Sequence, residues 1–599
     1  MRTEMAAMRD GVRLATDVYL PSGAGPWPVI LERTPYGRAA TRHTEISLAN
    51  PTPRDGAALA AACNARGYAV VLQDCRGRYG SEGRFVKYLA DGADGADTCG
   101  WINEQPWCDG HICTIGVSYG AHMQAALGCL DPPGLVAQVL DSGGFNDAWA
   151  SGARQGGAFE LRQATWALRE AMNSPEAKAD PVLRAALEAE DIHAWFAALP
   201  WQRGHSPLRH HRDYEATLFE QMRHGARDGF WKQVGIWAEG FHYRYSRADC
   251  VHLSSWFDPY VPTATGNFRG LRNAGRGRQR LVLGPWTHGN RSARVFGDVD
   301  FGPEAPIDSW AGDWLDYRLR HFDAATRGLP NPEPAVRVFV MGGGSGRRTE
   351  AGHLDHGGRW IAAADWPPPG VAASAWYLHN DMRLLPTQAT AGAAPVSYDF
   401  DPADPVPTIG GNFSSLDPVA VAGAFDQVAG ERFFGCRPPF LPLAARRDVL
   451  AFSTETLAAP VQMVGPVEAE LFVATDGPDT DFTAKLIDVY PASADYPCGY
   501  AMLLADTILR LRYAEDPGEP RLRRPGEVVH IRLGFSIANL FAAGHRIRLD
   551  ISSSNFPKFD VNRNTGEPEG ASRRRRVAVN TVFADAARPS RLVLPVLPL

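Results

Sequence analysis

Short apolar runs alternate with segments of helical composition over the first quarter of this 599-residue chain. Residues 68–73 and 136–141 are nearly continuous apolar runs, whereas residues 56–66 and 91–103 have the composition of helices. An apolar run of this length is typical of a parallel strand that is buried on both faces. The alternation therefore predicts an α/β fold, a doubly wound and mostly parallel sheet with helices on both faces.

A β-hairpin is predicted at the start of the chain. Residues 12–20 alternate between polar and apolar with period two, and residues 28–33 form a second run of strand composition. Pro21 and the Gly/Pro-rich residues 23–26 separate the two runs. Two such runs around a turn indicate strands that pair with each other.

The strand pattern stops at about residue 146 and resumes at 249–254, 279–284 and 335–341. The interval up to residue 244 is rich in Ala, Trp, Arg and His and has no strand-like run. Its helical stretches are 158–173, 181–190, 214–227 and 230–238. This predicts an all-helical insertion that lies as a cap over the active edge of one sheet domain.

Beyond about residue 365, segments such as 467–473 and 546–551 alternate strictly with period two. Few helical stretches lie among them, so an antiparallel β-sandwich of the jelly-roll type is predicted. The predicted domains are a sheet domain in two parts (1–145 and 245–365), a helical cap (146–244) and a jelly-roll domain (366–599).

Composition narrows the class of protein. A net charge of −6 gives no argument for nucleic acid or an anionic membrane as a partner, and no apolar run reaches membrane-spanning length. The basic run 573–576 is interpreted as a solvated loop. Nine cysteines without paired spacing indicate free thiols in a reducing compartment. We therefore expect a cytoplasmic protein without metal or cofactor. The sequence is compatible with a homo-oligomer.

Residues 113–120 carry the strongest chemical signal. Gly116-Val117-Ser118-Tyr119-Gly120 follows a short apolar strand and precedes a helical stretch, which is the context that a nucleophile elbow requires. The two glycines allow strand and helix to approach closely around a strained serine. Ser118 is the candidate nucleophile.

Two later strands end in residues that could complete a Ser-His-Asp triad. Asp258 follows the strand at 249–254, and His288 follows the strand at 279–284, in the chain order that α/β-hydrolases use. His288 would take the Ser118 proton, and Asp258 would orient the imidazole. Asp141 is a rival acid because it also ends a strand.

His122 and His252 are poorer candidates for the base. His122 lies on the helix after Ser118, and His252 lies inside a strand, so neither can easily swing toward the nucleophile. Helix surface and core packing are the expected roles of these two histidines.

An oxyanion formed at Ser118 needs preorganised donors. One is expected to be the backbone N–H of Tyr119, the residue after the nucleophile. The loop at 33–37 lacks the usual glycine pair, and Pro35 has no N–H to donate. The Tyr36 hydroxyl is the available substitute, although position alone equally allows an aromatic that packs on the sheet edge.

Motifs spread over nearly the whole chain point to one enzyme family. In the first half they are Arg33-Thr34-Pro35-Tyr36, Gln73-Asp74-x-Arg76-Gly77, Gly80-Ser81-Glu82-Gly83, Gln105-Pro106-Trp107, Gly116-x-Ser118-Tyr119-Gly120, Trp256-Phe257-Asp258 and Gly284-Pro285-Trp286-x-His288-Gly289. In the second half they are Asp404-Pro405-Val406-Pro407-Thr408, Arg447-Asp448-Val449-Leu450, Pro478-Asp479-Thr480-Asp481-Phe482 and Ser552-Ser553-Ser554-Asn555-Phe556-Pro557. The chain thus resembles the bacterial cocaine-esterase-like serine hydrolases, whose superfamily includes X-prolyl dipeptidyl-peptidases, α-amino-acid ester hydrolases and glutaryl-cephalosporin acylases.

The resemblance implies an α/β-hydrolase domain with a helical cap and a C-terminal jelly roll. It also implies catalytic roles for Ser118, Asp258 and His288 and an oxyanion donor in the Tyr36 hydroxyl. The substrate-binding positions that it implies are Trp149, Trp166 and Phe257.

The chain departs from the family pattern at two places, and the first of them bears on the substrate. Residues 259–261 lack the paired carboxylates that α-amino-acid ester hydrolases use to bind a substrate ammonium, which argues against that specificity. Residue 121 is Ala where relatives usually have a third Gly, and this small change should not disturb the turn.

The sequence therefore predicts a serine hydrolase that cleaves a small-molecule carboxylic ester or amide through an acyl-enzyme. Acylase or X-prolyl dipeptidyl-peptidase activity is the alternative within the enzymes. The alternative outside them is a binding protein that uses the jelly-roll domain.

Overall fold

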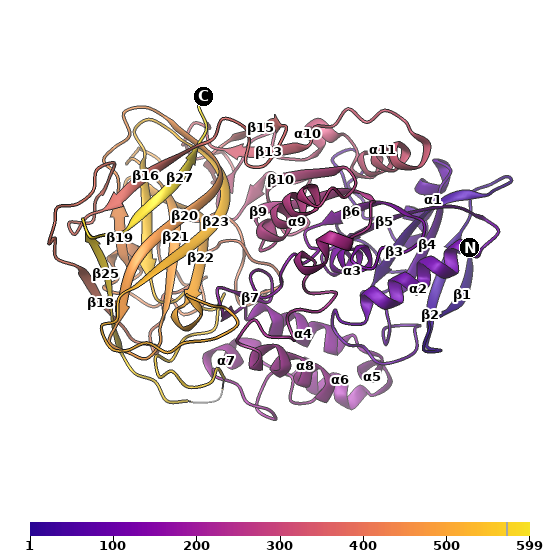
Figure 1. Ribbon diagram of the computed structural model, residues 1–599, viewed down its shortest axis with the longest axis horizontal. Coiled ribbons are helices and arrows are strands. Elements are labelled where there is room, and N and C mark those ends of the chain that lie inside the picture. Colours follow the sequence, from indigo (N-terminus) through magenta and orange to yellow (C-terminus); the bar gives the residue numbers. More distant parts are fainter. Residues whose placement is uncertain (571–572) are drawn as a thin grey trace.

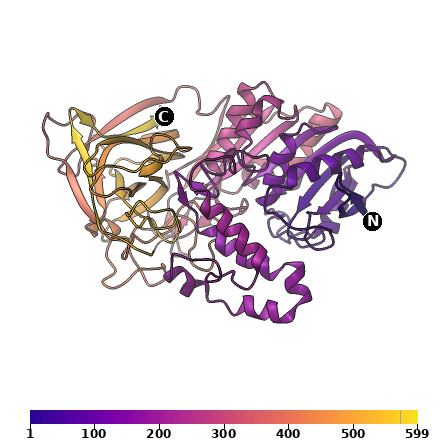
Figure 2. The same cartoon turned by 60° about the horizontal axis from the view of Figure 1, so that its bottom comes forward.

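The computed structural model describes residues 1–570 and 573–599. An α/β region and a β-rich region lie side by side, with a group of helices below their junction, and the two chain ends lie far apart (Figure 1). Turning the molecule brings these helices forward between the two regions (Figure 2). No helix among the described residues is long and apolar enough to cross a membrane.

A mostly parallel sheet forms the α/β region. Its strands pair in the spatial order β1 (Arg2–Ala7), β2 (Arg13–Tyr19), β4 (Ala69–Asp74), β3 (Trp27–Thr34), β5 (Cys108–Val117), β6 (Leu135–Asp141), β9 (Asp249–Phe257), β10 (Gln279–Thr287), β13 (Val336–Met341) and β15 (Gly358–Ala363). The seven strands from β4 to β13 are parallel. The carboxyl ends of all seven therefore meet at one edge, where sheets of this kind place their active sites.

The predicted hairpin at 12–33 is wrong. β2 pairs with β1 and β4, and β3 lies between β4 and β5. The tight turn is instead at residues 8–12, where the Met8 N–H donates to Val12 O (2.8 Å) and Gly11 adopts φ +83°. β1 was missed because most of its side chains are exposed at the sheet edge, so it has no apolar pattern.

Helices cover both faces of the sheet. Alternate residues of β4 show why: Val70 and Leu72 pack in one core, whereas Ala69 and Val71 pack in another. α1 (Gly56–Ala65) and α11 (Trp314–Arg327) contribute to the first core, and α2 (Asp91–Asn103) and α3 (Tyr119–Gly128) contribute to the second. Burial on both faces explains the continuous apolar runs of the sequence.

Residues 146–244 are mostly helical. Their α-helices are α4 (Arg162–Met172), α5 (Pro175–Ala179), α6 (Pro181–Glu188), α7 (Ile192–Ala197) and α8 (Arg212–Arg223). Ser174 and Asp180 cap two of them, each followed by a proline that suits the first helical turn. The helix predicted at 230–238 is absent, because this segment forms turns and Gly235 has φ +102°. A short hairpin, β7 (Arg154–Gln155) and β8 (Ala158–Phe159), was not predicted.

The second half of the chain forms two antiparallel sheets. One contains β16 (Ala372–Leu378), β18 (Val396–Phe400), β20 (Val461–Thr475), β23 (Val529–Phe541), β25 (Ala578–Asp585) and β27 (Arg591–Val596). The other has the order β19 (Leu450–Ser453), β24 (Arg546–Ser552), β21 (Asp481–Tyr490), β22 (Tyr500–Arg510). Residues 529–535 alternate between buried and exposed, as period-two strands with one solvated face do.

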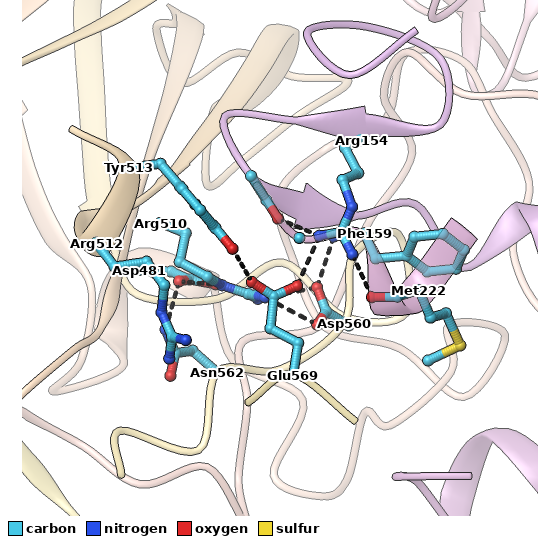
Figure 3. A network of polar contacts seen from close by, with 12 residues as sticks. Arg154, Phe159, Met222, Asp481, Arg510, Arg512, Tyr513, Asp560, Asn562 and Glu569 are labelled. Carbon is cyan, nitrogen blue, oxygen red and sulfur yellow. Dashed lines mark hydrogen bonds and ion pairs between the residues drawn. The ribbon is translucent and has the colours of Figure 1, made fainter. Parts of the chain in front are cut away.

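A buried ionic network joins the helical segment to the β-rich region (Figure 3). Arg154 of β7 donates to Glu569 (2.6 Å) and to the Met222 carbonyl oxygen (2.6 Å). Glu569 also pairs with Arg510 (3.1 Å) and accepts a hydrogen bond from the Tyr513 hydroxyl (2.8 Å). Although burial opposes its charge, the surrounding guanidinium groups lower the pKa of Glu569 to about 2.

Candidate active site

Ser118 lies at a sharp turn between β5 and α3. Its φ of +59° and ψ of −116° are strained for a residue with a side chain. Gly116 permits the turn, since a Cβ there would lie 2.9 Å from the Gly120 carbonyl carbon. The Ser118 N–H donates to Asp141 O (2.9 Å), and its own carbonyl oxygen accepts from His122 N (3.1 Å). This is the geometry of a nucleophile elbow.

Asp258 and His288 contact each other at the same sheet edge. His288 Nδ1 lies 3.0 Å from Asp258 Oδ2, and the Tyr260 N–H donates to Asp258 Oδ1 (3.1 Å). The Asp258 side chain is fully buried, whereas that of His288 is 20% exposed. A Cβ on Gly289 would lie 3.7 Å from Val117 Cγ1, so the His288 loop packs beside the residue before Ser118.

The rival acid Asp141 has other partners. Its Oδ2 accepts a hydrogen bond from Arg291, and its Oδ1 accepts from Ser142 Oγ (3.0 Å). Both Asp141 and Arg291 are buried. Asp141 therefore compensates a buried guanidinium.

His122 and His252 are both buried. The Gly144 N–H donates to His122 Nδ1 (3.0 Å), so Nδ1 carries no proton and Nε2 faces the Tyr260 hydroxyl (3.2 Å). His122 thus packs in the core and not on the helix surface. His252 contacts Gln279 (2.8 Å), and burial lowers its pKa to about 4.

Tyr36 follows β3 and reaches the cavity that contains Ser118. Its backbone N–H donates to Thr34 Oγ1 (3.1 Å), so only its hydroxyl is free to donate to a bound group. The Trp166 indole N–H donates to that hydroxyl oxygen (3.1 Å). Burial raises the pKa of Tyr36, with a smaller contribution from Glu170, so the phenol keeps its proton at neutral pH.

Tyr119 is the first residue of α3, and a helix leaves its first N–H groups without intrahelical partners. The Tyr119 hydroxyl accepts a hydrogen bond from Tyr88 N (2.7 Å). This contact anchors the Tyr119 ring at the start of α3.

The small cavity around Ser118 includes one of the three predicted substrate-binding aromatics, Trp166. Trp149 instead donates its indole N–H to Gly225 O (2.7 Å) and contacts the Tyr513 ring edge-on. Phe257 is fully buried against Phe301. Neither Trp149 nor Phe257 is among the described residues that line this cavity. The sequence did not single out six residues that do: Lys87, Tyr88, Arg162, Gln163, Tyr260 and Ser415.

Arg78 is a further residue that sequence reasoning missed. It is fully buried, and its guanidinium donates to Pro35 O (2.9 Å) and to Glu170 Oε2 (2.7 Å). Arg78 therefore holds the residue before Tyr36 against α4. Its place in a Gly/Arg-rich loop was the only sequence signal. Among the described residues, no group of three or more His, Cys, Asp or Glu side chains could hold a metal ion.

Comparison with known proteins decides the family. Residues 10–290 match the model of the X-Pro dipeptidyl-peptidase (S15) family, and residues 328–593 match that of the X-Pro dipeptidyl-peptidase C-terminal non-catalytic domain. The chain is 33% identical to the cocaine esterase of Rhodococcus sp. (strain MB1 Bresler), over 99% of this chain and 98% of that protein. The chain belongs to the cocaine-esterase-like branch of the S15 family. It is therefore a serine hydrolase.

Solved structures share the arrangement of this S15-family chain from end to end. An aminopeptidase from the marine sediment archaeon Thaumarchaeota archaeon has 26% identity and a TM-score of 0.77, over 100% of this chain and 96% of that one. An α-amino-acid ester hydrolase has 25% identity and a TM-score of 0.74, over 99% and 96%. A hydrolase core followed by a β-rich C-terminal domain is thus common to all three proteins.

Proposed function

We propose that this enzyme cleaves a carboxylic ester or amide through an acyl-enzyme on Ser118. The contact between His288 and Asp258, at the sheet edge that also carries Ser118, is the observation that supports this most directly. His288 would accept the Ser118 proton during attack and pass it to the leaving group. Asp258 would accept the hydrogen bond that His288 Nδ1 donates. This keeps His288 Nε2 unprotonated and free to take the Ser118 proton.

The reaction would proceed in two halves. Ser118 Oγ bonds to the carbonyl carbon, the bond to the leaving group breaks, and the leaving group departs with the proton from His288. Water then loses a proton to His288 and attacks the acyl-enzyme, which releases the acid and restores Ser118. No group beyond these side chains and water is needed to balance either half.

The Tyr119 N–H and the Tyr36 hydroxyl would stabilise the oxyanion. Support comes from the bond that Trp166 donates to the Tyr36 oxygen, because it leaves the phenolic proton free for a third group. A neutral phenol is the better donor here, and the raised pKa of Tyr36 keeps it neutral.

The site would lie where three parts of the chain meet. We assign residues 1–145 and 245–365 to an α/β-hydrolase domain, 146–244 to a helical cap and 366–599 to a jelly-roll domain. Trp166 and Arg162 of α4, together with Ser415 from the second half, line the Ser118 cavity. The cap and the β-rich domain would thus both shape the pocket for a small-molecule substrate.

Peptidase or acylase activity is the second candidate, because the aminopeptidase structure is similar over the full chain. The cavity speaks against a substrate ammonium, since among the described residues no carboxylate lines it, whereas Lys87 and Arg162 do. We therefore favour an ester or amide whose acyl part has no free amine.

Mixing the enzyme with p-nitrophenyl acetate tests the proposal. A burst of p-nitrophenol equal to the enzyme concentration is expected, and Ser118→Ala should abolish it. Ser142→Ala is a matched control, because Ser142 also directly follows a strand of the sheet and also has positive φ (+51°). A burst that survives in Ser118→Ala, or is lost equally in both variants, would contradict the assignment.

A further inference from the structure

The cavity around Ser118 contains a lysine whose charge no carboxylate compensates. Lys87 is 6% exposed, and its Nζ donates to Gln163 Oε1 (2.7 Å) and lies 3.8 Å from the centre of the Trp166 ring. Among the described residues, none forms an ion pair with Lys87. An ammonium has three protons to donate, so this one has room for a further acceptor.

Arg162, which also lines the cavity, differs from Lys87 because it has a carboxylate partner. Arg162 pairs with Glu160 (2.5 Å) and also donates to the Tyr260 hydroxyl (3.2 Å). Glu170, the carboxylate whose charge acts on Lys87, is already bonded to Arg78 (2.7 Å). The positive charge that remains for a ligand is therefore that of Lys87.

Burial makes this position costly for an ammonium in the empty enzyme. Desolvation lowers the pKa of Lys87 well below its ordinary value, and the charge of Arg162 adds to the effect. A bound anion would reverse both effects, since a buried charge becomes favourable when it is paired and hydrogen-bonded.

Gln163 fixes the direction in which Lys87 points. Its side-chain NH₂ donates to Gly152 O (2.7 Å), so its oxygen faces Lys87. Trp166, on whose ring Lys87 lies, donates to the Tyr36 hydroxyl. Lys87 is thus connected through one indole to the proposed oxyanion donor, in the cavity that Ser118 also lines.

We propose that the acyl part of the substrate carries a carboxylate that pairs with Lys87 Nζ. This rests on the proposed function and names its substrate class: half-esters or half-amides of dicarboxylic acids. The carboxylate takes no part in bond exchange. Ser118 attacks the other carbonyl, the leaving group departs with a proton, and water releases the dicarboxylate.

Two phenyl esters of equal length test the proposal. Phenyl hydrogen adipate ends in a carboxylate, and phenyl adipamate ends in a neutral amide. The wild type should hydrolyse the first with the higher kcat/KM. Lys87→Met, which keeps length but not charge, should lower kcat/KM for the carboxylate ester by about 10- to 100-fold and change that for the amide by less than about threefold.

Lys178→Met is the matched control. Lys178 also lies over an aromatic ring (3.9 Å from Tyr79) but outside the cavity, so both esters should react as with the wild type. Lys87→Arg should keep part of the preference for the carboxylate. Equal loss for both esters in Lys87→Met would mean a structural role and overturn the proposal.

A second pair of esters shows which part of the substrate must carry the charge. 4-Carboxyphenyl hexanoate carries its carboxylate on the leaving group, and phenyl hexanoate carries none. We expect these two esters to react alike, and a preference for the first that depends on Lys87 would overturn the acyl assignment. If p-nitrophenyl acetate gives a burst but the adipate esters react equally, this inference fails alone. If no ester gives a burst, the proposed function fails.

Discussion

At the scale of single residues, the oxyanion donor is the most specific assignment. The 33–37 loop offers no backbone N–H at Pro35, and that of Tyr36 is bonded to Thr34. The Tyr36 hydroxyl has a proton to donate, and its oxygen accepts a hydrogen bond from Trp166 (3.1 Å).

Replacing Tyr36 with Phe should lower kcat by about 100- to 1,000-fold and leave KM nearly unchanged, because the hydroxyl would act only in the transition state. Steady-state kinetics with a p-nitrophenyl ester measures both constants. Tyr79→Phe is the control, since Tyr79 is 37% exposed and does not line the cavity. A kcat within threefold of the wild type would require another donor.

At the scale of elements, the elbow depends on backbone that only glycine accommodates. Gly116 has φ +153°, and a Cβ there would press against Gly120. Gly116→Ala should therefore cost about 1–3 kcal/mol in stability and remove most activity by displacing Ser118. Thermal unfolding and p-nitrophenyl ester hydrolysis measure the two effects.

Gly100→Ala provides the contrast. Gly100 lies inside α2 with open space where its Cβ would be, so alanine should stabilise the protein by about 0.5–1 kcal/mol. Gly116→Ala with wild-type activity would show that the turn is not strained as described.

Strands that are buried on both faces could be predicted from the sequence, whereas exposed edge strands could not. β4, β5, β6, β9 and β10 are apolar on both faces, so their runs are visible, and Asp258 and His288 follow directly from where the runs end. β1 is an exposed edge strand and has no such pattern. Lys87 lies in a turn of residues 87–89, and it is buried only because α4, about 75 residues later, folds over it. Long-range packing of this kind leaves no local signal.

The aromatics that the resemblance implied as substrate-binding residues lie in different surroundings. Trp166 lines the Ser118 cavity, whereas Trp149 packs against Tyr513 of the β-rich region. A family motif gives the position of a side chain in the fold but not its rotamer, which depends on its neighbours.

At the scale of the whole molecule, the buried network around Glu569 holds the helical segment against the β-rich region. Because its folded pKa is about 2 and the ordinary value is about 4.3, Glu569 contributes stability that is present above about pH 4.3 and lost as the pH falls toward 2. The contribution is about 3 kcal/mol.

Glu569→Gln should therefore lower the thermal unfolding midpoint at pH 7, since it removes the carboxylate that pairs with Arg154 and leaves Arg510 with only Asp481 and Asp560 as counter-charges. The gap between wild type and variant should narrow as the pH is lowered from 5 to 3. Glu455→Gln, at an exposed position, should show neither effect. A gap that stays constant with pH would mean that the charge of Glu569 is not what stabilises the junction.

Labelling with a fluorophosphonate tests the central claim most directly, because such a probe reacts covalently with an activated serine. Mass spectrometry of the digested enzyme should find one adduct, on the peptide that contains Ser118. His288→Ala should slow its formation by orders of magnitude, since the base would be lost. An adduct on another serine, or none in protein that hydrolyses esters, would contradict the account.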